Sequence, residues 1–194
     1  MSEMIIPIGL DIETSTNNTL SGVIIQIGVA FYKNNEIYSE QWSVKYPISY
    51  WNNDNWSLES SQVHNISKQY LDQSSNNIEE LDAILYNYLK SLNSEAIFIP
   101  VGFNVGSYDL MFIKKEMPKL HSILSHRTIE LNTLFLIQSK KGDYINRNWS
   151  EKKKHTINKI IAKLGEDKLH NAGFDAMLAL HILEEFSLSN NGKQ

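Results

Sequence analysis

Residues 4–12 read MIIPIGLDI, a short apolar run that reaches an acidic residue near its end. An apolar run of this length is typical of a buried strand. Residues 22–32, GVIIQIGVAFY, predict a second strand, and Asn34-Asn35 predicts a tight hairpin turn into a third strand over residues 36–45. The start of the chain therefore predicts three consecutive strands, which we expect to be antiparallel.

Patterns typical of strands and helices alternate further along the chain. We expect a short helix over 57–66, an amphipathic helix over 78–92, a strand over 96–103, a helix over 109–117, a strand passing into a helix over 127–136, and helices over 156–164 and 173–186. The polar and aromatic stretch after Pro47 predicts a surface loop. This order predicts an α/β fold, with a mixed sheet and helices on its faces. We expect one domain over residues 1–187 and a flexible tail over 188–194.

Composition and charge narrow the class of protein. The chain has 194 residues, of which 42% are hydrophobic and 21% charged, as in a globular domain with a sizeable core. It has no apolar run of the ~20 residues that a membrane span needs, and its first residues lack a secretory signal pattern. We therefore expect a cytoplasmic protein that binds no membrane, with the nucleus as the alternative. The chain contains no cysteine, so any metal must be held by oxygen or imidazole ligands.

The formal net charge of −4 does not by itself indicate a nucleic-acid-binding protein. Local patches decide contact with phosphates, and residues 140–159 read KKGDYINRNWSEKKKHTINK. This stretch carries seven Lys or Arg residues against Asp143 and Glu151. It is a candidate phosphate-binding surface, although a solvated loop and helix face would have the same composition.

Asp11 and Glu13 lie at the end of the first predicted strand. Side chains two apart on a strand point to the same face, so both carboxylates project together from a buried apolar segment. Buried anions repel each other unless a cation compensates them. The pair therefore indicates a metal site, although the D-x-E pattern alone is common.

Two further acidic positions are expected at the starts of helices. Asp109 follows the strand over 96–103 and a glycine-containing turn, at the edge of the sheet where α/β ligand sites gather. Asp175 falls in the first turn of the last helix, and His170 lies in the loop just before it. Imidazole can exchange protons near neutral pH, which suits a catalytic base. The alternative for both acids is stabilisation of a helix N-terminus through the macrodipole.

Taken in order, these motifs resemble those of the DEDDh group of DnaQ-like 3′–5′ exonucleases. The matching pattern is D-x-E, a later Asp at a strand–helix turn, and H-x-x-x-x-D at the last helix, and the resemblance covers nearly the whole chain. It implies a ribonuclease H-like fold with a five-stranded mixed sheet, three antiparallel strands being followed by parallel ones. Position 171 is Asn and not Tyr, which favours the histidine branch over the tyrosine branch.

The resemblance implies a role for each motif. Asp11, Glu13, Asp109 and Asp175 would bind two Mg²⁺ ions, for which Mn²⁺ would be a substitute, and His170 would be the general base. The substrate would be a single-stranded or frayed 3′ end of DNA or RNA. Any polymerase or repair partner would be a separate chain. Candidate substrate contacts are Thr14, Ser15, Phe103, Asn104 and Tyr108.

Two departures from the family pattern leave the polymer open. Asn104 lies five residues before Asp109, where members of this branch commonly have Asn four residues before the Asp, and the first motif continues Thr14-Ser15-Thr16. We favour DNA as substrate, with a 3′–5′ exoribonuclease as the alternative. A noncatalytic nucleic-acid-binding module is a third reading, which the retention of all five groups disfavours because unneeded buried acids destabilise a fold.

Overall fold

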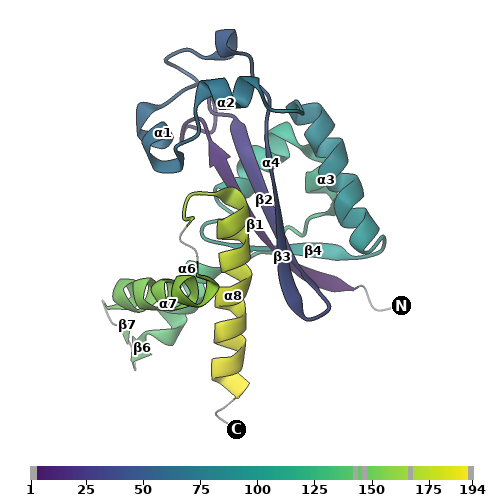
Figure 1. Cartoon of the computed structure of the whole chain (residues 1–194). Helices are drawn as coiled ribbons and strands as arrows, with labels where there is room; N and C mark the ends of the chain where they lie inside the picture. The colour runs from purple at the N-terminus through teal and green to yellow at the C-terminus, as the bar shows by residue number, and fades with distance from the viewer. Residues whose placement is uncertain (1–3, 142–143, 146–147, 166–167, 192–194) are drawn as a thin grey trace.

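The computed structural model describes residues 4–141, 144–145, 148–165 and 168–191. Five strands form one mixed sheet in the order β3-β2-β1-β4-β5 (Figure 1). They are β1 (Ile5–Thr14), β2 (Ile24–Lys33), β3 (Glu36–Ser43), β4 (Ile97–Gly102) and β5 (Ile129–Glu130). The first three are antiparallel neighbours, whereas β4 runs parallel to β1 and to β5. The predicted α/β fold with a mixed five-stranded sheet is confirmed.

The turn between β2 and β3 is the predicted two-residue hairpin. Asn34 and Asn35 have φ angles of 52° and 64°, so both adopt the left-handed conformation that a type I′ turn requires. Asparagine tolerates this conformation better than most residues. The turn sets the register of the hairpin, in which Lys33 pairs with Glu36.

Helices cover both faces of the sheet (Figure 1). On one face, α8 (Ala172–Asn191) crosses β1, β2 and β3, and α6 (Leu131–Gln138) and α7 (Trp149–Leu164) pack beside it. On the other lie α3 (Ile78–Leu92), α4 (Asp109–Glu116) and α5 (Pro118–Ile123). Two apolar clusters result, one on each side of the sheet. None of the helices in the described part of the chain has both the length and the apolar character that crossing a membrane requires.

Alternation along β1 separates its core residues from its acids. Ile8, Leu10 and Ile12 are buried in the cluster on the α3–α4 side. The alternating residues Gly9, Asp11 and Glu13 therefore face the side of α8. The carboxylates of β1 thus face the helix that carries Asp175.

Two glycines let α8 lie directly on the sheet. A Cβ atom on Gly9 would overlap the backbone carbonyl of Ala176, and one on Gly28 would overlap the backbone of Ala172. Any larger residue at either position would have to push the helix away. The close approach brings the first turn of α8 against the strands that carry and neighbour the acids.

Several elements differ from the predicted ones. The helix α7 begins at Trp149, earlier than the expected Thr156, and α8 continues to Asn191. Residues 188–191 of the expected tail form the end of this helix, while 192–194 lie outside the described residues. The additional short elements are η1 (Ile48–Tyr50), α2 (Lys68–Asp72), α5, β6 (Lys140–Lys141) and β7 (Tyr144–Ile145).

The stretch after Pro47 is not a simple surface loop. Trp51 and Trp56 are partly buried against the apolar cluster on the α3–α4 side of the sheet, and their ring centroids are 4.7 Å apart. Tyr46 packs against Trp51 at 5.1 Å. The segment leads into α1 (Leu58–His64), so these rings fix the position of a helix that lies beside the acids.

Candidate active site

The acids of β1 lie where three segments meet: the end of β1, the turn between β4 and α4, and the first turn of α8. Asp11 pairs with Gly28 and Glu13 with Gln26 in the register of β1 and β2. Burial, followed by repulsion from Asp109, Asp175 and Glu13, raises the pKa of Asp11 well above its usual value. The four carboxylates therefore share one low-dielectric region and disfavour each other's ionisation.

Asp109 joins the β4–α4 turn to β1. It is the first residue of α4, is buried, and its Oδ1 accepts the backbone N–H of Ile12 at 3.0 Å. Burial raises the pKa of Asp109 to about 7, although the backbone N–H groups that bind its carboxylate oppose the shift. Since Ile12 lies between Asp11 and Glu13, this bond holds Asp109 beside the D-x-E motif.

Asp175 and His170 are joined through the backbone. His170 has a φ of 64°, and its N–H donates to Oδ2 of Asp175 at 2.8 Å. Asn171, between them in sequence, caps the helix by accepting the N–H of Phe174 at 3.1 Å. The loop before α8 is thus bent so that the histidine stands beside the acid of the first helical turn.

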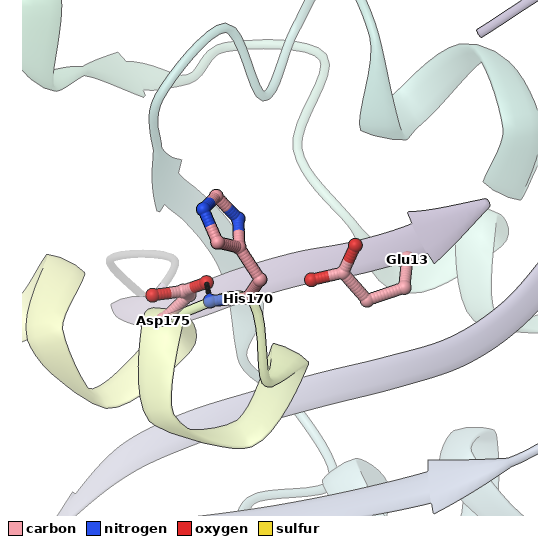
Figure 2. Close-up of side chains that lie close together, drawn as sticks. All are labelled: Glu13, His170 and Asp175. Atoms are coloured by element: carbon pink, nitrogen blue, oxygen red, sulfur yellow. Dashed lines mark hydrogen bonds between the residues drawn. The ribbon is translucent and has the colours of Figure 1, made fainter. Parts of the chain in front are cut away.

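Glu13, His170 and Asp175 come together across the two elements. Each offers one ligand atom, and these atoms lie within 4.8 Å of one another. Figure 2 shows the Glu13 carboxylate pointing from β1 toward the His170–Asp175 pair. Burial, followed by Asp175 and Asp109, raises the pKa of Glu13 to about 8. A positive charge bound among these groups would stabilise the ionised carboxylates.

The donor set fits a hard divalent cation. Carboxylate oxygens predominate, and a bound cation would offset both the burial and the mutual repulsion that raise the pKa values of Asp11 and Glu13. Mg²⁺ and Mn²⁺ prefer oxygen ligands, and Mg²⁺ usually binds through a few carboxylates together with waters and substrate phosphates. The residues present are therefore suited to the expected ions.

Two glutamines, which the sequence did not single out, hold the first turn of α8. Gln26 Oε1 accepts the N–H of Ala172 at 3.0 Å, and Gln41 Oε1 accepts the N–H of Gly173 at 3.3 Å. The first N–H groups of a helix have no partner within it, so these bonds satisfy donors that would otherwise be unpaired. A buried glutamine in the apolar run IIQIGV was the signal that could have identified Gln26.

Thr14 and Tyr108 line a cavity next to Glu13. Their hydroxyl oxygens are 2.6 Å apart, which joins the end of β1 to the start of α4. The cavity has a volume of about 150 Å³, and its lining comprises Ile12, Glu13, Thr14, Ser60, Val63, His64 and Tyr108. The third hydroxyl-bearing candidate, Ser15, is fully buried outside this lining, where its Oγ accepts the N–H of Val23 at 3.1 Å.

His64 also faces this cavity, although the sequence gave no reason to place it there. Its Nδ1 accepts the N–H of Ile66 at 2.9 Å. Burial, with His170 nearby, lowers the pKa of His64 to about 4, so its ring is neutral at physiological pH. A neutral ring that accepts at Nδ1 carries its proton on Nε2.

The two remaining candidates lie at the start of the β4–α4 turn. Phe103 is half-buried, with the ammonium of Lys153 4.0 Å from its ring centroid. Asn104 is exposed and has a φ of 59°. The predicted basic stretch contributes Lys152, Lys153 and Lys154 on α7, while its residues 142–143 and 146–147 lie outside the described part of the chain.

Comparison with known proteins gives structural relatives only. No protein-family model matches the sequence, and no curated protein matches it. Among solved structures, cell-death related nuclease 4 (CRN-4) superposes with a TM-score of 0.61 at 17% identity, covering 94% of this chain and 64% of that protein. S. pombe Pop2p, solved with Mg²⁺ and Mn²⁺ bound, gives 0.60 at 17% identity, covering 92% of this chain and 81% of that one.

A third relative is E. coli exonuclease I in complex with single-stranded DNA and zinc. It gives a TM-score of 0.59 at 12% identity, and covers 96% of this chain. The chain spans only 64% of CRN-4 and 40% of exonuclease I. At these identities the likeness concerns the fold: the chain has the architecture of these three proteins.

Proposed function

We propose that this protein is a metal-dependent 3′–5′ exonuclease of the DEDDh type, with DNA as the favoured substrate. The observation that carries the proposal is the convergence of Asp11, Glu13, Asp109, His170 and Asp175, which come from three separate segments, at one end of the sheet. Support comes from the fold, which is that of CRN-4, described as a nuclease, and of exonuclease I, described in complex with single-stranded DNA.

The carboxylates would hold two divalent cations and His170 would act as the base. Ions bound there would neutralise charge on the phosphate oxygens and acidify the attacking water. His170, exposed on its loop, accepts the proton of that water, a contribution of roughly 10²–10⁴ in rate. The water oxygen forms a bond to phosphorus as the bond to the 3′ oxygen breaks. The products are a nucleoside 5′-monophosphate and a strand that ends in a new 3′ hydroxyl.

The end of the strand would bind in the cavity beside Glu13. Thr14 and Tyr108 present hydroxyl groups there, and the neutral His64 ring forms part of the cavity wall. These groups can bind the sugar or base of a terminal nucleotide without adding negative charge to the acidic cluster. In this proposal the 3′-terminal nucleotide lies on the α1 side of the carboxylates.

The test is release of nucleotide from labelled strands in the presence of Mg²⁺. Single-stranded and duplex DNA and RNA, labelled at the 3′ end or the 5′ end, should give free 5′-monophosphate and a ladder that shortens from the 3′ end. The variants D11A and D175A should lose turnover and stay folded. The control E95Q changes an exposed acid near the start of β1, at the opposite end of the strand from Glu13, and should retain turnover. Wild-type rates in D11A or D175A would refute the site, and faster turnover of RNA would establish the exoribonuclease alternative.

A negative result in this assay also has a definite meaning. If folded, Mg²⁺-loaded protein binds the strands but releases no nucleotide from any of them, the chain is a noncatalytic binding module and the enzymatic proposal is wrong.

A further inference from the structure

Lys153 on α7 is a half-buried cation with neutral partners. Its Nζ donates to Oδ1 of Asn132 at 2.9 Å and lies 4.0 Å from the centroid of the Phe103 ring. Within the described residues, no carboxylate oxygen comes within the 4.0 Å of an ion pair with it. By contrast, Lys115 pairs with Glu116.

This environment leaves the charge of Lys153 incompletely compensated. Removing an ammonium from water is unfavourable, and burial lowers the pKa of Lys153 accordingly. An amide oxygen and the face of an aromatic ring each attract a cation, but neither carries a full negative charge. An anion bound beside Nζ would complete the site.

A chain of side chains connects Lys153 to the turn that precedes Asp109. Asn132, which accepts from Lys153, donates through Nδ2 to Oδ1 of Asn104 at 3.0 Å. Asn104 begins the turn between β4 and α4, and Asp109 ends it. A second bond, from the N–H of Gly106 to Glu130 at 2.7 Å, holds the middle of the same turn. Lys153 is therefore held in a fixed relation to the carboxylates without touching them.

We propose that Lys153, together with the exposed amide of Asn104 to which Asn132 connects it, binds a backbone phosphate of the substrate on the 5′ side of the scissile one. The inference rests on the proposed function, because that function places the scissile phosphate at the carboxylates and the terminal nucleotide in the cavity beside α1. In Figure 1, α1 lies above the first turn of α8 and α7 lies below it. A strand that ends at α1 and crosses the acids continues in its 5′ direction toward α7.

The proposal changes the role expected for Phe103. Because the ammonium of Lys153 covers one face of the ring, no base can stack on that face while the lysine remains there. Phe103 instead orients the cation toward the substrate. A contact to phosphate carries no base preference, as an enzyme that removes successive nucleotides requires.

A phosphate-deletion cycle tests the contact directly. Fluorescein-labelled single DNA strands, each with one uncharged methylphosphonate at a different linkage from the 3′ end, are titrated with protein in Ca²⁺ and followed by fluorescence anisotropy. For wild-type protein, one internal linkage on the 5′ side of the last should weaken binding roughly tenfold when neutralised. K153M, which keeps the apolar stem on Phe103, should bind the normal strand about tenfold more weakly and be insensitive to that linkage.

The matched control is K154M, because Lys154 is the exposed neighbour on the same helix. It should keep the wild-type sensitivity at that linkage. K153R should retain most of the affinity, and K153M should reduce the slope of log affinity against log salt by about 1. Additive effects of K153M and the methylphosphonate at every linkage would overturn the proposal, as would an effect confined to the melting temperature.

Failure of this inference is distinguishable from failure of the proposed function. The same strands are incubated in parallel with Mg²⁺ and assayed for released nucleotide. If nucleotide is released but K153M and the methylphosphonate are additive at every linkage, the phosphate contact is refuted and the exonuclease proposal stands. If K153M abolishes the sensitivity to one linkage but no nucleotide is released, the contact is supported and the exonuclease proposal is refuted. If the protein binds none of the strands, both proposals are wrong.

Discussion

Gln26 Oε1 accepts the backbone N–H of Ala172 at 3.0 Å, so a residue of β2 holds the helix that carries Asp175. Gln26 is opposite Glu13 in the register of β1 and β2 and is itself buried. Its amide nitrogen donates to the hydroxyl of Ser43 at 3.2 Å, which fixes its orientation. Gln26 thus contributes, with Gln41 and the close contacts at Gly9 and Gly28, to the distance between the acid of the strand and the acid of the helix.

Replacing Gln26 with methionine should lower both stability and turnover. Q26M keeps the shape of the side chain but leaves the buried N–H of Ala172 without an acceptor, which costs about 1–3 kcal/mol. The free energy of unfolding by urea and the kcat for nucleotide release measure the two effects. The matched variant Q41M removes a longer and less buried bond, of 3.3 Å to Gly173, and should lose less of both. Equal losses would show that Gln26 has no special part in positioning Asp175.

Without metal, the buried carboxyl group of Asp11 should destabilise the fold, and removing its charge should therefore stabilise the protein. Because burial and three neighbouring acids raise the pKa of Asp11, D11N should increase the melting temperature without metal by roughly 2–4 °C, or ~1 kcal/mol. It should also reduce the further increase that Mg²⁺ or Mn²⁺ gives to the wild type, and abolish activity. Thermal unfolding with and without the ions measures both changes. A D11N protein that Mg²⁺ stabilised as much as the wild type would argue against Asp11 as a ligand.

Tyr108 should contribute to binding of the strand end more than to the chemical step. Y108F removes the hydroxyl that lies 2.6 Å from Thr14 Oγ1 in the cavity beside Glu13. Loss of one neutral hydrogen bond of about 1 kcal/mol predicts a several-fold higher KM with kcat nearly unchanged. The control is Y70F, which removes a hydroxyl at the exposed edge of β3. A lower kcat with an unchanged KM would indicate that Tyr108 acts on the reacting atoms.

Glu116, which is not one of the candidate catalytic acids, should make the stability of the fold depend on pH. Its carboxylate accepts the N–H of Ile24 at 3.0 Å, and burial raises the pKa of Glu116. A carboxylate whose pKa is higher in the folded state favours folding most when protonated. This contribution is complete below the unfolded pKa of about 4.3 and is lost as the pH rises through the folded value.

The comparison of E116Q with the wild type isolates this contribution. E116Q keeps an amide oxygen for Ile24 but cannot ionise, so its free energy of unfolding, relative to that of the wild type, should increase as the pH rises from about 4 to 7. Urea unfolding at several pH values measures the difference. E116A, which loses the acceptor, should be less stable at every pH, and a difference between E116Q and wild type that did not vary with pH would contradict the assignment.

The sequence predicted the sheet well because its signals are local. Alternation along β1 separates Ile8, Leu10 and Ile12 from the acids, and Asn34-Asn35 has the chemistry of its turn. The start of α7 was missed because the residues that follow Asn148 are mostly charged or polar, although Asn148 and Glu151 have the spacing of a capping box. Apolar periodicity does not locate the first turns of a helix that lack an apolar stripe.

The remaining parts of the site depend on contacts between distant segments. His64 belongs to none of the motifs that the sequence indicated, yet the fold brings it to the cavity beside Glu13. The partners of Lys153 are likewise 21 and 50 residues away in sequence, at Asn132 and Phe103. Sequence order predicted the acids, and only packing shows what surrounds them.

The left-handed backbone of His170 has a practical consequence. Asparagine adopts this conformation readily, so H170N should keep the bend of the loop and the N–H bond to Asp175 while removing the imidazole. The result would be a correctly assembled but inert protein, with every carboxylate in place. Such a variant could capture an intact strand for crystallography, and so display the route of the polymer across the surface.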